Sequence, residues 1–232
     1  MKLAKRLFIT RKSSIPELKY QKQELSSFSG LVVFQKLFSD LNLSKRLSGC
    51  LPRSCETKQH ASVSLLFRLL IINALIGMRK LRDVDFYRED PMVKRALGVR
   101  VLPSVPTISR LLTCCDSQSV SKLRIQSSEL VLERLAGEKL STLTLDFDGS
   151  VISTSRKAEG VASGFNKKKG MRSYYPLFCT IAQSGQILDL LHRSGNVHDS
   201  RGSIGFVKQC VQKVRNALPG VRLEIRMDSA FF

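Results

Sequence analysis

The sequence predicts an α/β fold, in which a helical front region is followed by a mixed sheet with a packed helix. Before about residue 140, apolar residues recur every three or four positions, which is the period of a buried helix face. After residue 141 they alternate with polar residues, which is the period of a strand. Hydrophobic residues make up 43% of the 232 residues, enough for a packed core, so wholesale disorder is excluded.

The front region contains several predicted helices. Residues 31–41 and 63–80 carry apolar side chains at helical spacing. Prolines and a glycine between residues 91 and 106 then divide the chain into short pieces. Residues 106–112 and 121–140 show helical spacing again. We therefore expect residues 1–140 to form a mainly helical region.

The period changes in the second region, residues 141–232. Leu143, Leu145 and Phe147 alternate with polar residues, which predicts a strand with Asp146 and Asp148 on one face. A hairpin is expected over 175–182 and 187–193, after a loop over 160–170 that is rich in Gly, Ser and Lys. An amphipathic helix over 204–218 follows, with Asn196 or Asp199 available to cap its start, and then a strand over 221–227. The predicted order is strand, hairpin, helix, strand.

The chain is strongly basic, with 38 Lys and Arg against 19 Asp and Glu and a formal net charge of +19. Residues 1–140 hold 25 basic and 12 acidic side chains, whereas residues 141–232 hold 13 and 7. Cationic side chains that neutralise phosphates release counterions, so this excess favours nucleic acid as the partner, with an anionic membrane surface as the alternative. The first 22 residues, with seven basic side chains and one acid, are interpreted as a mobile basic arm.

Cysteine usage and hydropathy bear on the compartment. Six cysteines are scattered through a chain without a signal-peptide pattern, which predicts a reducing cytoplasm. The longest apolar run, 63–78, contains Arg68 and Asn73 and is shorter than the roughly 20 residues of a membrane span, so no membrane partner is predicted. The spacing of Cys50, Cys55 and His60 lacks a C-x2-C pair, so we interpret these residues as packed or in a loop rather than as zinc ligands.

Aspartates lie toward the ends of two predicted strands, Asp146 and Asp148 on the first and Asp228 on the last. Mg²⁺ prefers oxygen ligands and is commonly held by one or two protein carboxylates together with substrate phosphate. Two such ions can stabilise the attacking and leaving oxygens of a phosphoryl transfer. By spacing alone, an aspartate that ends a turn or caps a helix remains the alternative.

Several short blocks then occur in a fixed order. They are LDFDGSV at 145–151, GFNKKKG at 164–170, YYPL at 174–177, GNVH at 195–198 and RMDSAF at 226–231. In this order they resemble the catalytic domain of DDE transposases of bacterial insertion sequences. The segments LRD at 81–83, DP at 90–91 and LPSVPTISR at 102–110 resemble the helical DNA-binding part of the same enzymes.

The resemblance implies an RNase H-like catalytic domain in which two aspartates and one glutamate hold two Mg²⁺ or Mn²⁺ ions. Such enzymes hydrolyse DNA at transposon ends and join the freed 3′ hydroxyl to target DNA. Asp148 corresponds to the first aspartate, because Ser150 follows it after one residue as in the family, and Asp228 corresponds to the second. Asp146 is the alternative first aspartate, or else a supporting or capping residue.

The third acid has no counterpart, because the chain ends four residues after Asp228 and residues 229–232 contain no glutamate. The resemblance therefore predicts an incomplete RNase H-like domain that binds transposon ends but does not cut DNA by itself. The alternative is a non-catalytic, DNA-binding or inhibitory remnant of a transposase.

The candidate DNA contacts are Lys167, Lys168 and Lys169 in the predicted loop and Arg110 and Lys94 in the front helices. A solvated loop and ordinary surface charge are the respective alternatives. The partners implied are double-stranded DNA, as transposon ends and target, with a second copy of the chain as a further candidate. The resemblance places the chain in the bacterial cytoplasm, associated with the nucleoid.

Overall fold

The computed structural model describes residues 25–52, 63–154, 158–164, 171–228 and 231. The predicted basic arm and the lysines at 167–169 lie outside these ranges. So do Cys55 and His60, whereas Cys50 is buried in the front core.

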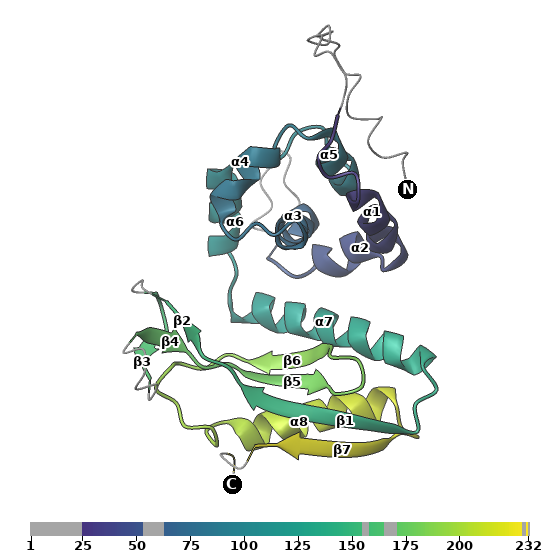
Figure 1. Ribbon diagram of the computed structural model, residues 1–232, viewed down its shortest axis with the longest axis vertical. Helices are drawn as coiled ribbons and strands as arrows, with labels where there is room; N and C mark the ends of the chain where they lie inside the picture. The colour runs from purple at the N-terminus through teal and green to yellow at the C-terminus, as the bar shows by residue number, and fades with distance from the viewer. Residues whose placement is uncertain (1–24, 53–62, 155–157, 165–170, 229–230, 232) are drawn as a thin grey trace, which may run out of the picture.

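The front helices pack around α3, which Figure 1 shows in the middle of the upper part of the molecule. Leu66, Leu69 and Ile72 of α3 are fully buried. The elements of this part are α1 (Leu31–Asp40), α2 (Leu43–Ser48), α3 (Val63–Leu75), a 3₁₀ turn η2 (Leu81–Asp83), α4 (Val84–Tyr87), α5 (Pro91–Leu97) and α6 (Val105–Thr113). The helical prediction is confirmed for the described residues of this region, although α3 ends five residues before the expected residue 80. Gly77 follows in the left-handed conformation (φ 81°) and turns the chain away.

Two of the prolines that divide this region begin helices. Pro91 is in the first turn of α5, where the Asp90 carboxylate accepts hydrogen bonds from the backbone N–H groups of Met92 and Val93. Ser104 caps α6 in the same way from the Thr107 N–H, with proline again in the first turn. Proline suits these positions because the first N–H groups of a helix have no partner within it.

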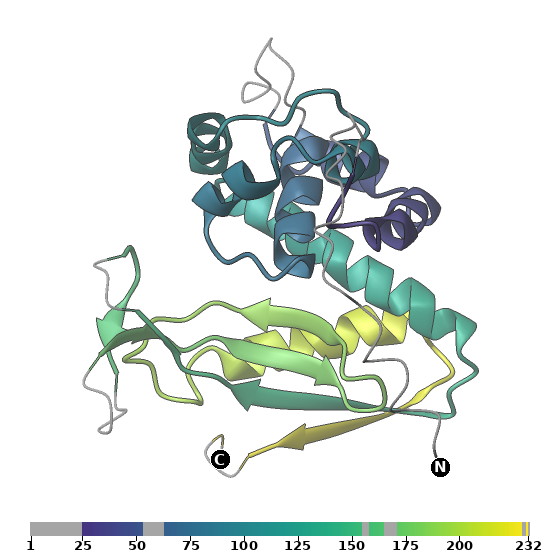
Figure 2. The ribbon, with the colours of Figure 1, turned by 45° about the horizontal axis from the view of Figure 1, so that its top comes forward.

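Helix α7 (Ser117–Gly137) lies between the front helices and the sheet (Figures 1 and 2). It begins earlier than residue 121, because the Asp116 side chain caps it by accepting a hydrogen bond from the Ser119 N–H at 2.7 Å. Val131, Leu132 and Leu135 pack into the sheet core, while Leu123 and Leu130 pack against the front core. The helix therefore contributes to both hydrophobic cores.

The larger sheet has the strand order β6-β5-β1-β7. Its strands are β1 (Thr142–Gly149), β5 (Leu177–Ile181), β6 (Ile187–Leu191) and β7 (Arg222–Met227), and helix α8 (Ser203–Ala217) connects β6 to β7. β5 pairs antiparallel with both β1 and β6, whereas β7 pairs parallel with β1. The mixed sheet and the predicted hairpin are confirmed, and Gly185 makes the hairpin turn with φ 68°.

Helices α7 and α8 cover one face of this sheet. Leu143, Leu145 and Phe147 of β1 point into that layer and are buried, and Phe147 meets Phe206 of α8 edge-on at 5.9 Å between ring centroids. Asp146 and Asp148 therefore lie on the opposite face, as the alternation predicts.

A second, smaller sheet is absent from the sequence prediction. It has the order β2-β4-β3, formed by β2 (Ile152–Ser153), β4 (Arg172–Tyr174) and β3 (Ala162–Ser163). Strands of two or three residues are too short to show a period. The expected cap of α8 is also wrong, because Gly202 stands at its start with no capping side chain. Among the described helices, none is long and apolar enough to cross a bilayer.

Candidate active site

The parallel pairing of β1 with β7 brings two acidic residues to the same end of the sheet. Asp146 lies opposite Arg226, and Phe147 lies opposite Met227. Asp148 follows Phe147 within β1, Asp228 directly follows the last residue of β7, and both are exposed. Neighbouring strands run about 4.8 Å apart, so carboxylates at these positions can reach a shared cation.

Asp146 is engaged differently, although it shares a face of β1 with Asp148. The Arg226 guanidinium donates to both of its carboxylate oxygens, with Nε 3.0 Å from Oδ1. Hydrogen bonding from Arg226 lowers the pKa of Asp146, and the positive charge of Arg226 adds to this effect. Both oxygens of Asp146 are thus used in holding β7 against β1.

Tyr175 packs directly behind the end of β1. A Cβ atom on Gly149 would lie 2.5 Å from the Tyr175 hydroxyl, so only glycine allows this approach. Burial raises the pKa of Tyr175 to about 12, and hydrogen bonding to Asp199 and the negative charges of Asp199 and Asp148 contribute further. The tyrosine therefore stays neutral and links the end of β1 to the segment that follows β6.

Arg193 fixes that segment. Its side chain is buried, with the residue 7% exposed, and its guanidinium carbon lies 5.0 Å from the centre of the Tyr175 ring. Nε donates to the Tyr175 carbonyl at 3.0 Å, and Nη1 donates to the Asp199 carbonyl at 2.8 Å. Arg193 and Asp199 were not predicted as functional residues, and the only signal for Asp199 is its position directly after the GNVH block.

A cavity of about 350 Å³ opens beside these residues. Val151, Tyr175, Val197, His198 and Asp199 line it, together with Ser173 and two glycines, Gly164 and Gly195. A Cβ atom on Gly195 would lie 2.4 Å from the Ser173 carbonyl oxygen, and one on Gly164 would lie 2.2 Å from the Gly195 carbonyl oxygen. Both glycines are therefore required by close backbone packing.

Of the remaining residues, His198 lines this cavity, whereas Lys94 and Arg110 lie on the front helices. His198 contacts the Ser200 hydroxyl through Nδ1 at 2.9 Å, within the turn before α8. Lys94 forms an ion pair with Glu89 at 2.6 Å. Arg110 is exposed on α6 and donates to the Thr107 hydroxyl at 3.4 Å. Within the described part of the chain, no group of three or more His, Cys, Asp or Glu side chains is arranged to hold a metal ion.

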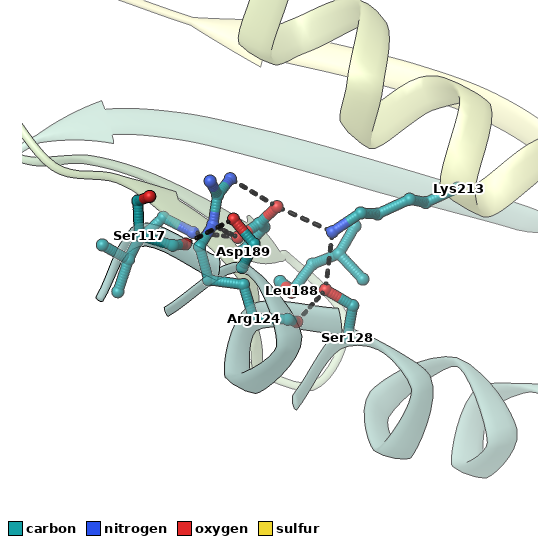
Figure 3. Close-up of polar contacts among 8 residues, drawn as sticks. Ser117, Arg124, Ser128, Leu188, Asp189 and Lys213 are labelled. Atoms are coloured by element: carbon teal, nitrogen blue, oxygen red, sulfur yellow. Dashed lines mark hydrogen bonds and ion pairs between the residues drawn. The ribbon is translucent and has the colours of Figure 1, made fainter. Parts of the chain in front are cut away.

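A buried carboxylate holds the helices that support the sheet (Figure 3). Asp189 of β6 accepts hydrogen bonds from Arg124 of α7, with Nε at 2.8 Å, and from Lys213 of α8, with Nζ at 2.8 Å. Lys213 also donates to the Ser128 hydroxyl at 2.8 Å, which in turn donates to the Leu188 carbonyl at 3.0 Å. Burial acts to raise the pKa of Asp189, but hydrogen bonding from Arg124 and Lys213 outweighs it and the net pKa is lowered. Sequence reasoning missed this network, because its members are far apart in the chain.

The structure is a mixed α/β fold with a helical front region. Two aspartates, Asp148 and Asp228, lie where β1 and β7 end, which agrees with the arrangement that the transposase resemblance implies. The family model described as transposase DDE domain group 1 matches residues 11–232, so the chain belongs to the DDE transposase family. Members of this family generally use divalent metal ions.

Comparison with solved structures gives a similarity to a piggyBac transposase in a synaptic complex with hairpin DNA. The sequence identity is 12% and the TM-score is 0.37, and the match covers 84% of this chain and 50% of the piggyBac chain. The chain thus spans about half the length of that transposase. Comparison with curated proteins gives no match.

Proposed function

We propose that this chain binds transposon-end and target DNA through its basic helical region, residues 1–140. In this proposal residues 141–232 hold Mg²⁺ or Mn²⁺ through Asp148 and Asp228, and they serve DNA strand cleavage and transfer only when the three-acid site is complete. The observation that supports the proposal is the register of β1 and β7, whose last pair, Phe147 with Met227, is followed in the chain by Asp148 and Asp228.

The residues at this strand end fit a divalent ion. Two exposed carboxylates supply hard oxygen ligands and leave room for water or a DNA phosphate in the remaining positions. A bound ion would stabilise charge on the phosphoryl oxygens. The chain itself contributes the positioning, because β1 and β7 fix the two aspartates and the pair of Asp146 with Arg226 ties these strands together.

Arg110 is the strongest of the predicted DNA contacts. Lys94 forms an ion pair with Glu89, whereas Arg110 is exposed and donates a hydrogen bond to the neutral Thr107 hydroxyl. An exposed guanidinium whose charge is not neutralised by a carboxylate suits a backbone phosphate.

A second candidate function is DNA binding without cleavage. It is favoured because the described residues place two aspartates at the strand end, whereas the family resemblance implies three acids, and no cluster of three or more potential ligands occurs in this part of the chain. A site with two of its three carboxylates holds an ion with less charge and looser geometry. In this function the chain occupies transposon ends and blocks an active transposase.

Metal binding tests the site. Calorimetric titration of Mn²⁺ into the wild-type chain should show weak binding that Asp148→Asn and Asp228→Asn each abolish. Asp146→Asn should weaken binding less, because that carboxylate is already paired with Arg226. Asp40→Asn, on α1, is the matched control and should leave binding unchanged. The strongest loss at Asp146 would reverse the assignment of the first ligand.

Both functions require DNA binding, and cleavage separates them. For binding, we expect duplex DNA to bind with a steep salt dependence, since log affinity falls by about 0.9 per neutralised phosphate for each log unit of salt. With Mg²⁺ and a duplex carrying a transposon end, we expect no nicking by this chain. Nicking that disappears in Asp148→Asn would show that the residues present complete the active site.

A further inference from the structure

A second pocket lies in the front region, between helices α1, α2, α3 and α5. Its volume is about 240 Å³, and it is lined by Phe38, Ser39, Ser44, Arg68, Arg95 and Ala96, with Gln35 and Gly98 at its border. Two arginines and two serine hydroxyls thus meet over an apolar floor, because Phe38 and Ala96 are buried. Each of these polar groups can donate a hydrogen bond to an oxyanion.

No acidic residue lines this pocket. The acid next to it in sequence, Asp40, forms an ion pair with Lys36. Arg68 and Arg95 form no ion pair with any described residue. Among the described residues, the pocket therefore combines two arginines that have no carboxylate partner with neutral hydrogen-bond donors.

Arg68 is the unusual member, because it is the one charged residue of helix α3 and is half-buried. Its guanidinium makes one hydrogen bond within the described residues, from Nε to the Ser64 carbonyl at 3.3 Å, which leaves the two terminal nitrogens for a ligand. Burial lowers the pKa of Arg68, and it is the one cause of this shift. A partly desolvated cation without a carboxylate is unfavourable for the fold alone and is relieved by a bound anion.

We propose that the pocket formed by Ser39, Ser44, Arg68 and Arg95 binds a phosphate group of the DNA backbone. Arginine binds phosphate through two parallel N–H groups, and serine hydroxyls supply the donors that remain. The volume is below the roughly 300–1,000 Å³ of sites that enclose a whole ligand, which suits one phosphate group that projects from a larger molecule. The DNA source follows from the location, since residues 1–140 carry the larger basic excess. This step rests on the DNA binding proposed above.

The first experiment uses inorganic phosphate as the probe for the pocket. Phosphate at constant ionic strength should raise the melting temperature of the wild-type chain, because a ligand that binds the folded state stabilises it. Arg68→Met should abolish the rise. Arg134→Met, which removes an exposed arginine from α7, should keep it. Arg95→Met is the second variant if Arg68→Met does not fold, because Arg95 is exposed and its loss leaves the core intact.

The second experiment identifies the source of the phosphate. The steepness of log affinity for duplex DNA against log salt should decrease by about 0.9 in Arg68→Met or Arg95→Met, the value for one lost phosphate contact. It should not change in the control Arg134→Met. A phosphate effect on melting with an unchanged slope would assign the pocket to a free anion and overturn the DNA source. No effect in either assay would overturn the pocket itself. If the wild-type chain does not bind DNA at all, the proposed function fails, whereas the melting assay still judges the pocket.

Discussion

Replacing Asp189 with asparagine tests how strongly the buried network of Figure 3 holds the helical layer on the sheet. Asparagine has the same shape, but it carries no charge and turns one acceptor oxygen into an amide donor. Arg124 and Lys213, which both donate to Asp189, would then face one acceptor and one donor. One of the two cations would lose its partner.

The magnitude follows from the burial of the three side chains. The Asp189 side chain is 2% exposed, whereas the Arg124 and Lys213 side chains are 31% and 27% exposed. Removing one partner of a fully buried ion pair costs about 3–5 kcal/mol. Because water can reach the two cations, we expect the lower end, about 3 kcal/mol.

Urea denaturation measures this loss as a fall in the midpoint at unchanged slope. The matched control is Asp40→Asn, which removes an exposed (i, i+4) pair with Lys36 and should cost about 0.3–0.5 kcal/mol.

The pH dependence gives a second check. The folded-state pKa of Asp189 lies below its unfolded value of about 3.9, so its contribution is present above pH 4 and is lost as the pH falls through the folded-state pKa. The difference between wild type and Asp189→Asn should therefore shrink below about pH 4. A cost at pH 7 equal to that of the control would refute the reasoning.

Three further predictions concern single residues. Gly195→Ala should lower the melting temperature, because its Cβ would lie 2.4 Å from a backbone oxygen, whereas Gly205→Ala in α8 meets no atom within 4 Å and should stabilise the helix by up to about 1 kcal/mol. In an ultraviolet titration Tyr175 should ionise near pH 12, so Tyr175→Phe should lose an ionisation step in that range. If the step that Tyr175→Phe loses lies near pH 10 instead, the burial of Tyr175 would be contradicted. Arg226→Met should cost less than about 1 kcal/mol in urea, because its ion pair with Asp146 is largely exposed, and a larger loss would mean that this pair is essential to the edge of the sheet.

The main elements of the fold follow from local patterns in the sequence. The burial of Leu143, Leu145 and Phe147 follows from period two, and the helices follow from periods of three and four, because both patterns depend on neighbouring residues. The short strands β2, β3 and β4 could not be predicted in this way. β2 and β3 both pair with β4 across a separation of about ten to twenty residues, and Gly164, Ser173 and Gly195 pack closely beside them. Local spacing carries no sign of these contacts.

The candidate site shows the same division. The sequence blocks identify Asp148 and Asp228, and their placement on adjacent strands remained hidden until the parallel pairing of β1 with β7 was known. Asp199 and Arg193 were missed because their contacts with Tyr175 depend on the path of the chain after β6. The ligand role of the two aspartates stays a prediction.

The register also explains why Asp146 and Asp148 differ, although they share one face of one strand. Asp146 lies opposite Arg226, so an ion pair satisfies it within the fold. Beyond the last pair of this register, Phe147 with Met227, the two segments continue into Asp148 and Asp228. Two carboxylates on neighbouring strand ends supply oxygen ligands of the kind that a divalent cation prefers. A divalent ion should therefore stabilise the folded chain through Asp148 and Asp228, which lie one step beyond the residue pairs that hold β7 beside β1.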